Sequence, residues 1–179
     1  MFPLTHPFWL IHPVRWIWAA IAAALGLLAA AHAFEAFGHM PPCELCLKQR
    51  DLYWTAAAAG AAALVACRLA PARLLPRVGC AVLALIFLGE AGVAVYHAGV
   101  EWAFWPGPAA CTGGPRVHVT VADLQAFAHG RTYPVVRCDQ PAFRFLGLSM
   151  AGWNGLIALK LSGLSLWSAL VRPPAETRA

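Results

Sequence analysis

The sequence predicts an all-α fold, a polytopic membrane four-helix bundle, and two observations support this class. The 179 residues are 60% hydrophobic and 12% charged, with a mean hydropathy of +0.63, which is too apolar for a soluble domain. Four segments also approach the roughly 20 apolar residues that a membrane-spanning helix needs. These segments are roughly 16–37, 52–70, 78–97 and 146–170. We therefore treat residues 1–179 as a single integral membrane domain.

Each segment has its own justification. The first and the last are clear from hydropathy alone. The second is rich in alanine rather than leucine, so its assignment depends on its neighbours. An A-x-A pattern at 31–33 would also suit the cleavage site of a signal peptide. The long tryptophan-containing stretch before the first apolar run is unusual for a signal peptide, so a retained span is favoured.

The arginines predict the orientation of the bundle, because cytoplasmic loops are enriched in Lys and Arg. They precede the first span, fill the loop between the second and third, and follow the fourth. These residues are Arg15, Arg68, Arg73, Arg77, Arg172 and Arg178. Both termini are therefore expected in the cytoplasm, with outer loops near 38–51 and 98–145. Lys48 and Arg50 are minor exceptions, and we interpret the net charge of +5 as a topology signal rather than a nucleic-acid signal.

The long outer loop contains the stretch "TVADLQAFAHG" at 120–130. Val121, Leu124 and Phe127 recur at helical spacing, and Gly130 is a typical stop. This pattern predicts a short amphipathic helix, which would lie on the outer leaflet. A loop helix that simply packs on the bundle fits the pattern equally well.

The predicted topology divides the six cysteines into two groups. Two lie in each outer loop, where disulfides can persist, and two lie at the cytoplasmic ends of the second and third spans. The outer cysteines are Cys43 and Cys46 in the first loop and Cys111 and Cys138 in the second. We interpret Cys67 and Cys80 as small apolar packing residues.

The outer cysteines suit redox chemistry better than a metal site. Zinc sites usually present two close pairs of ligands, whereas Cys111 and Cys138 are far apart and the nearby histidines have no recognisable ligand spacing. We therefore expect no metal. A Cys-x-x-Cys motif allows one sulfur to attack and the other to resolve.

The surroundings of the motif "PPCELCLKQRD" favour a reactive thiol. The two prolines predict that the second helix begins near Cys43, and a helix N-terminus stabilises a thiolate. Arg50 follows Cys46 by one helical turn, so a permanent cation lies within reach of that sulfur. Alternatively, Arg50 is an interfacial residue that pairs with Glu44 or Asp51.

Ionisable residues inside the predicted spans are costly and usually have a role. Glu90 and Lys160 lie at similar depths, so an ion pair between them is geometrically possible. His32, Glu35 and His39 share one face near the outer end of the first span. They could bind metal or relay protons, but we favour ordinary interfacial positions.

The chain resembles the DsbB-type disulfide-bond formation proteins of bacterial inner membranes. The resemblance is carried by "PPCELCLKQR", "YHAGVEWAFWPGPAAC" and "RCDQPAFRFLGLSMAGWN", together with the four-span layout. Members of this family are four-helix quinone reductases that reoxidise a soluble thioredoxin-fold oxidase in the periplasm. The resemblance implies a protein-dithiol:quinone oxidoreductase with a DsbA-type partner, ubiquinone or menaquinone as cofactor, and active cysteines on the periplasmic side.

The resemblance also implies site residues. Cys43 and Cys46 match the membrane-proximal pair of the family, with Cys46 meeting the quinone. Cys111 and Cys138 match the second pair, with Cys111 attacked by the partner. Arg50 matches the arginine beside the quinone. His97 matches, more loosely, a histidine near it.

Two other functions are alternatives to a protein-dithiol:quinone oxidoreductase. The first is a membrane binding module whose outer cysteines hold a metal or form purely structural disulfides. The second is a vitamin-K-epoxide-reductase type of enzyme, in which the Cys-x-x-Cys belongs near a later helix. Here the motif opens the second helix, which disfavours that relative.

Overall fold

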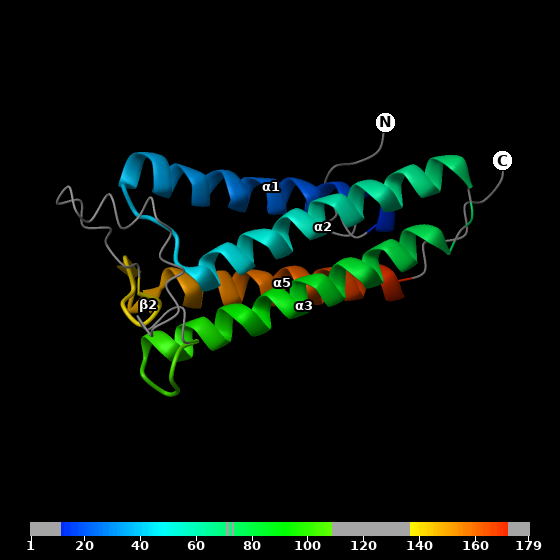
Figure 1. Cartoon of the computed structure of the whole chain (residues 1–179). Coiled ribbons are helices and arrows are strands. Elements are labelled where there is room, and N and C mark those ends of the chain that lie inside the picture. The colour runs from blue at the N-terminus through cyan, green and yellow to red at the C-terminus, as the bar shows by residue number, and fades with distance from the viewer. Residues whose placement is uncertain (1–11, 71, 73, 109–136, 172–179) are drawn as a thin grey trace.

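The structure is a computed structural model, which describes residues 12–70, 72, 74–108 and 137–171. In these residues, long helices pack side by side along most of their length (Figure 1). They are α1 (Pro13–Gly38), α2 (Glu44–Leu69), α3 (Leu75–Glu101) and α5 (Met150–Leu170). The predicted all-α membrane bundle is thus confirmed. The helix predicted at 120–130 and Cys111 lie outside the described residues.

Helices α1, α2 and α3 are long and apolar enough to cross a membrane. Helix α5 has 21 residues, which corresponds to about 31 Å of helix and to the thickness of the hydrocarbon core. Its hydropathy is lowered by Asn154, Lys160 and several serines. The fourth predicted span is therefore a helix of adequate length whose polar residues need partners inside the bundle.

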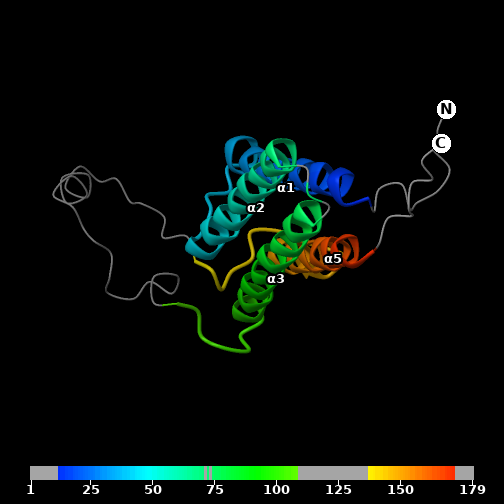
Figure 2. The same cartoon turned by 90° about the vertical axis from the view of Figure 1, so that its right-hand side faces the viewer.

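Helix α5 packs most extensively against α3 (Figure 2). Its buried face repeats small residues at helical spacing, which allows two helix backbones to approach closely. These residues are Ala151, Gly155, Ala158, Ser162, Ser165, Ser168 and Ala169. The hydroxyl of Ser162 donates to the carbonyl of Ala84 at 2.8 Å, and that of Ser165 accepts from Trp16 Nε1 at 2.8 Å. The hydroxyls of Ser162 and Ser165 thereby join α5 to α3 and α1.

The fourth predicted span begins too early, at 146. Residues 146 and 147 form the turn of a small antiparallel hairpin, in which β1 (Arg144–Phe145) pairs with β2 (Leu148–Ser149). Leu146 and Gly147 both have positive φ, 51° and 81°, as two-residue hairpin turns require. Helix α5 then starts at Met150 because the Ser149 side chain caps it by accepting from Gly152 N at 3.1 Å.

The second helix begins where the two prolines predict. Helix α1 ends at Gly38, and its C-cap His39 has a left-handed φ of 51°. Cys43 is the N-cap of α2, so the helix extends well before the apolar run predicted to start at 52. Within its first turns, Lys48 pairs with Glu44 at 3.0 Å.

The main apolar core lies between α1, α2 and α3, around Ile17, Leu83 and Phe87. Cys80 is buried there and Cys67 is partly buried, and both are free thiols, as their interpretation as packing residues requires. At this end of the bundle, Arg77 Nε donates to the carbonyl of Ala169 at 2.7 Å. The hairpin and the Cys43–Cys46 pair occupy the opposite end.

Candidate redox site

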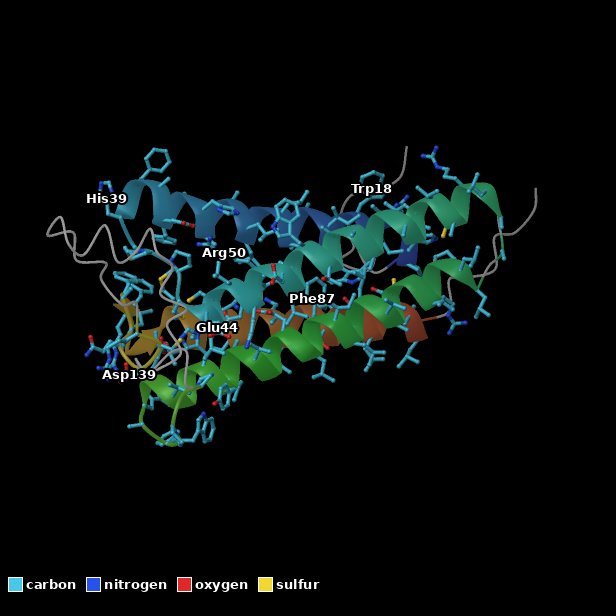
Figure 3. The ribbon with its side chains drawn as sticks, viewed as in Figure 1. Trp18, His39, Glu44, Arg50, Phe87 and Asp139 are labelled. Atoms are coloured by element: carbon cyan, nitrogen blue, oxygen red, sulfur yellow. The ribbon has the colours of Figure 1, made fainter. Side chains whose placement is uncertain are left out.

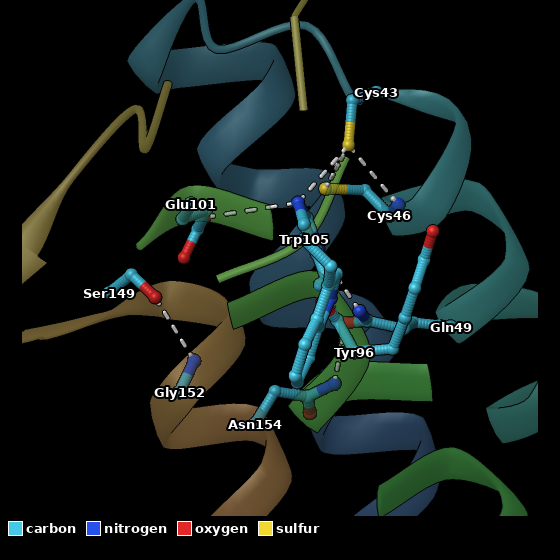
Figure 4. A network of polar contacts seen from close by, with 10 residues as sticks. Cys43, Cys46, Gln49, Tyr96, Glu101, Trp105, Ser149, Gly152 and Asn154 are labelled. Carbon is cyan, nitrogen blue, oxygen red and sulfur yellow. Dashed lines mark hydrogen bonds and ion pairs between the residues drawn. The ribbon is translucent and has the colours of Figure 1, made fainter. Parts of the chain in front are cut away.

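The first two cysteines meet at the start of α2 (Figure 4). Their sulfurs are 3.1 Å apart, and both are free thiols with Cys43 as the donor. The backbone N–H of Cys46 donates to Cys43 Sγ at 3.4 Å, which is the N-cap contact. The hydrogen bond to Cys46, together with burial, raises the pKa of the Cys43 thiol well above its ordinary value. Cys43 therefore holds its proton and directs it toward Cys46.

Helix α3 places His97 beside this pair. His97 Nε2 lies 3.6 Å from Cys43 Sγ and 3.8 Å from Glu101 Oε1, and its side chain is buried. Cys43 and His97 are 54 positions apart in the chain, so only helix packing brings them together. The family resemblance implies a histidine near the cofactor at this position. The structure places His97 against the sulfur of Cys43 and at the edge of the cavity described below.

Cys43, Cys46 and His97 have their ligand atoms within 4.8 Å of one another. Two sulfurs and an imidazole at this spacing are chemically able to hold a soft metal ion. The same arrangement suits thiol exchange, in which a polar ring stabilises charge on sulfur. His32, Glu35 and His39, the other candidate group, do not gather in this way, because the exposed His39 is the C-cap of α1.

Arg50 joins α2 to α1 (Figure 3). Its Nη1 donates to Glu35 Oε2 at 2.5 Å and its Nη2 to the carbonyl of Ala31 at 3.1 Å. The alternative in which Arg50 pairs with Glu44 or Asp51 is therefore wrong. Glu35, for which an interfacial position is expected, lies near the end of α1 with its carboxylate as the counter-ion of Arg50. His32 Nδ1 lies 3.8 Å from the same Glu35 oxygen.

The second predicted pair is described only in part, because Cys111 lies outside the described residues. Cys138 is disulfide-bonded and 1% exposed, and it packs in a buried cluster with Cys43, Leu45 and Val100. The structure thus brings Cys138 and Cys43 together. On either side of Cys138, Arg137 and Asp139 form two hydrogen bonds of 2.9 and 2.6 Å, which hold the pKa of Asp139 below its ordinary value.

A cavity of about 510 Å³ opens beside the pair, a volume in the usual range for small-molecule sites. Its walls come from α1, α2, α5, the end of α3 and the segment that follows Cys138. Most of them are apolar, including Leu27, Phe34, Phe143, Met150 and Ile157. The polar groups at its edge include Cys46, Gln49, Arg50, His97 and Asn154.

Sequence reasoning missed a set of buried polar residues behind His97. Asn154 Nδ2 donates to Gln49 Oε1 at 2.7 Å and to Glu90 Oε1 at 2.6 Å, and Gln49 Nε2 lies 3.2 Å from His97 Nδ1. The possible ion pair between Glu90 and Lys160 is therefore not formed, and Lys160 is exposed on the outer side of α5. The available signal was an asparagine in an otherwise apolar helix, since such a residue usually bonds across helices.

The geometry of the pair predicts which thiol reacts first. Brief treatment of the reduced protein with iodoacetamide at neutral pH should modify Cys46 before Cys43. Thiolates are the reactive form, and a raised pKa keeps Cys43 protonated at that pH. Fragment-ion mass spectrometry of the peptide that contains both residues measures the order, and buried Cys80 is the unreactive control. Equal modification of the two sulfurs, or faster modification of Cys43, would contradict the geometry.

Comparison with known proteins identifies one family. The family model described as disulfide bond formation protein DsbB matches residues 14–168 of the 179-residue chain. No curated protein and no solved structure matches. The family match includes nearly all of α1, all of α2 and α3, most of α5, and Cys43, Cys46, Cys111 and Cys138. The chain therefore belongs to the DsbB family and is a membrane-embedded oxidoreductase with a role in disulfide bond formation.

Proposed function

We propose that this protein reoxidises a periplasmic DsbA-type dithiol by disulfide exchange and passes the electrons to a membrane quinone. One observation carries the proposal: a Cys-x-x-Cys pair borders a mostly apolar cavity between membrane helices. A water-soluble electron acceptor would not need an apolar cavity at this place. A lipid-soluble acceptor would.

The residues of the cavity fit a quinone. Its apolar walls suit a ring with an isoprenoid tail, and both ubiquinone and menaquinone have this character. Cys46, Arg50 and His97 are the predicted cofactor-binding residues that border it. When bound, the quinone supplies a two-electron acceptor. The guanidinium of Arg50, held in place by Glu35, would direct its donors toward a carbonyl oxygen and stabilise negative charge there.

The cysteines of the chain would carry the electrons in a series of exchange steps. The thiolate of the partner attacks Cys111 in a Cys111–Cys138 disulfide, which releases Cys138 as a thiolate. Cys138 then attacks Cys43 of an oxidised Cys43–Cys46 pair, and Cys46 leaves as a thiolate. The burial of Cys138 in one cluster with Cys43 supports this second step.

The balance of the reaction is simple. The second thiol of the partner displaces Cys111, so the partner leaves with a disulfide. Cys111 then attacks Cys138 of the Cys43–Cys138 bond, which restores the Cys111–Cys138 disulfide and releases Cys43, so that Cys43 and Cys46 are both reduced. Closing the Cys43–Cys46 bond again would release two electrons and two protons, which is the number needed to reduce a quinone to a quinol. The Cys43 proton already points at Cys46, so the reduced pair holds a proton between its two sulfurs.

The proposal includes a location and an orientation, which are the bacterial inner membrane with both termini cytoplasmic and the active cysteines periplasmic. Arg68 and Arg77 at the α2–α3 turn support it, since this end lies opposite the cysteine pair. Green fluorescent protein fused after residue 179, on the proposed cytoplasmic side, should fluoresce. The same protein fused after residue 108, on the proposed periplasmic side, should stay dark. The reverse pattern would refute the orientation.

Replacing the sulfur beside the cavity tests the reaction itself. Purified protein should reduce ubiquinone-1 in the presence of a reduced DsbA-type partner, and Cys46→Ser should lower this rate to background because a hydroxyl cannot form the disulfide. Cys67→Ser is the matched control and should keep the wild-type rate. Quinone reduction is followed by its ultraviolet absorbance. Full activity of Cys46→Ser would refute the mechanism, and zinc that persists through purification would favour the metal-binding alternative.

The proposed role of Arg50 in quinone binding is tested by replacing an arginine with lysine at two positions. Arg50→Lys keeps the charge but loses the fork of donors, so the KM for quinone should rise about tenfold, as expected for one lost hydrogen bond to a charged group. Arg77→Lys makes the same change at the other end of the bundle and should leave the KM unchanged. Steady-state rates at varied quinone concentration measure both. A wild-type KM for Arg50→Lys would remove Arg50 from the proposed quinone site.

A further inference from the structure

Four polar side chains behind the cysteine pair, three of them buried and one partly buried, connect α2, α3 and α5, and no step of the proposed reaction uses them. They are Gln49, Tyr53, Glu90 and Asn154, and all lie within hydrogen-bond distance of one another or of His97. We propose that Glu90, Asn154 and Gln49 are positioning residues that hold the His97 imidazole with its proton on Nε2, directed at Cys43. The purpose of this arrangement rests on the proposed function, but the arrangement itself does not.

The orientation begins at Asn154. Its Oδ1 accepts from the hydroxyl of Tyr53 at 2.6 Å, and its Nδ2 donates to Glu90 Oε1 at 2.6 Å. Glu90 is fully buried, and its Oε2 has no hydrogen-bond partner in the described part of the chain. Whether or not Oε2 carries a proton, Oε1 is an acceptor, and an acceptor selects the nitrogen of the facing amide. Tyr53 and Glu90 together therefore set which way the Asn154 amide points.

The orientation passes to Gln49 through the second hydrogen of Asn154 Nδ2. This hydrogen is donated to Gln49 Oε1 at 2.7 Å, which turns Gln49 Nε2 toward His97 Nδ1 at 3.2 Å (Figure 4). An amide NH₂ group is only a donor, so Nδ1 must present its lone pair. In a neutral imidazole the single N–H is then on Nε2.

This tautomer determines what His97 offers to the sulfur. Nε2 faces Cys43 Sγ at 3.6 Å and Glu101 Oε1 at 3.8 Å, and the backbone of Cys138 also bonds to the ring. With its proton on Nε2, the ring presents an N–H to this group of acceptors, Cys43 among them, and does not accept the Cys43 proton. Cys43 in turn donates to Cys46. From Asn154 through Gln49, His97 and Cys43 to Cys46, each residue thus donates a hydrogen bond to the next. Hydrogen bonds aligned in series in this way polarise one another. Negative charge is stabilised at the end of the series, on Cys46.

The same tautomer disfavours a metal at this place. A metal ion bound by Cys43, Cys46 and His97 would need the lone pair of Nε2, because that nitrogen faces the sulfurs. The proton would then lie on Nδ1, opposite the NH₂ group of Gln49, where two donors would meet. The direction of the series therefore supports thiolate chemistry over metal ligation.

The cost of these residues argues that they have a role. Burying Asn154, Gln49 and Glu90 in an apolar bundle requires desolvating three polar groups, and apolar side chains of similar volume would avoid it. Ser162, which also joins α5 to α3, shows that a single hydroxyl is enough to connect these helices. These three residues lead to the imidazole of His97 beside a reactive cysteine pair. Orienting that imidazole explains their presence better than joining the helices does.

The test uses the full-length reduced protein with ¹⁵N-labelled histidine and the isosteric variant Gln49→Glu. Glutamate keeps the shape of glutamine but presents an acceptor to His97, so the proton should move to Nδ1. Nitrogen chemical shifts distinguish the two tautomers and the charged ring. Alkylation of Cys46 by iodoacetamide should slow about tenfold, the effect of losing one hydrogen bond that stabilises a charge. Ser162→Ala removes another buried contact of α5 and should change neither measurement.

Asn154→Asp is a second variant, for use where Gln49→Glu does not fold. Its carboxylate can still accept from Tyr53 but has no hydrogen to donate to Gln49, so the His97 tautomer should again be lost. A proton on Nδ1 in the unmodified protein would overturn the inference, as would an unchanged tautomer in Gln49→Glu or Asn154→Asp. Both measurements need neither partner nor quinone. A protein with the Nε2 tautomer that fails to reduce quinone would refute only the proposed function.

Discussion

The N-cap of α2 is the contact on which the rest of the site depends. Two prolines precede this helix, and Cys43 is its N-cap. The sulfur of Cys43 accepts a hydrogen bond from the backbone N–H of Cys46. That contact fixes the two sulfurs 3.1 Å apart at the positive end of a helix. Gln49 and Arg50 follow within the next two turns of α2, on different faces of the helix. Gln49 faces α3 and α5, and Arg50 faces α1.

The remaining helices supply what the N-cap cannot. Helix α3 provides the imidazole of His97 and the carboxyl of Glu90, α5 provides the amide of Asn154, and α1 provides Glu35. In a bundle surrounded by lipid, each of these groups must find its hydrogen bonds inside the protein. This requirement couples the packing of the helices to the orientation of the site. A rotation of α5 would leave Asn154 without Gln49 and would release His97.

The cavity and Cys138 both border the cysteine pair. Cys43 is buried in one cluster with Cys138, Cys46 packs against that cluster, and both cysteines of the pair line the cavity together with Arg50. The pair therefore lies next to another cysteine and next to a cavity that can hold a ligand. The raised pKa of Cys43, which retains its proton, assigns different chemical states to two residues that are only three positions apart.

The sequence alone determined the class of the molecule, the start of α2 at Cys43 and the two free cysteines at the other end. It also identified Cys46 and Arg50 as neighbours. These features depend on composition and on spacing within one helix, where three or four residues set which side chains share a face. The resemblance carried by the motifs supplied the family and the candidate roles.

Only the tertiary structure decided which residues meet across helices. Arg50 pairs with Glu35 and not with Glu44 or Asp51, and Glu90 bonds to Asn154 and not to Lys160. His97 contacts Cys43 from a position 54 residues away. The physical reason is rotation: the spacing within a helix says which side chains share a face, but not toward which neighbouring helix that face turns. That choice is made when small residues on α5 and α3 let the helices approach and most buried polar groups find partners on the neighbouring helices.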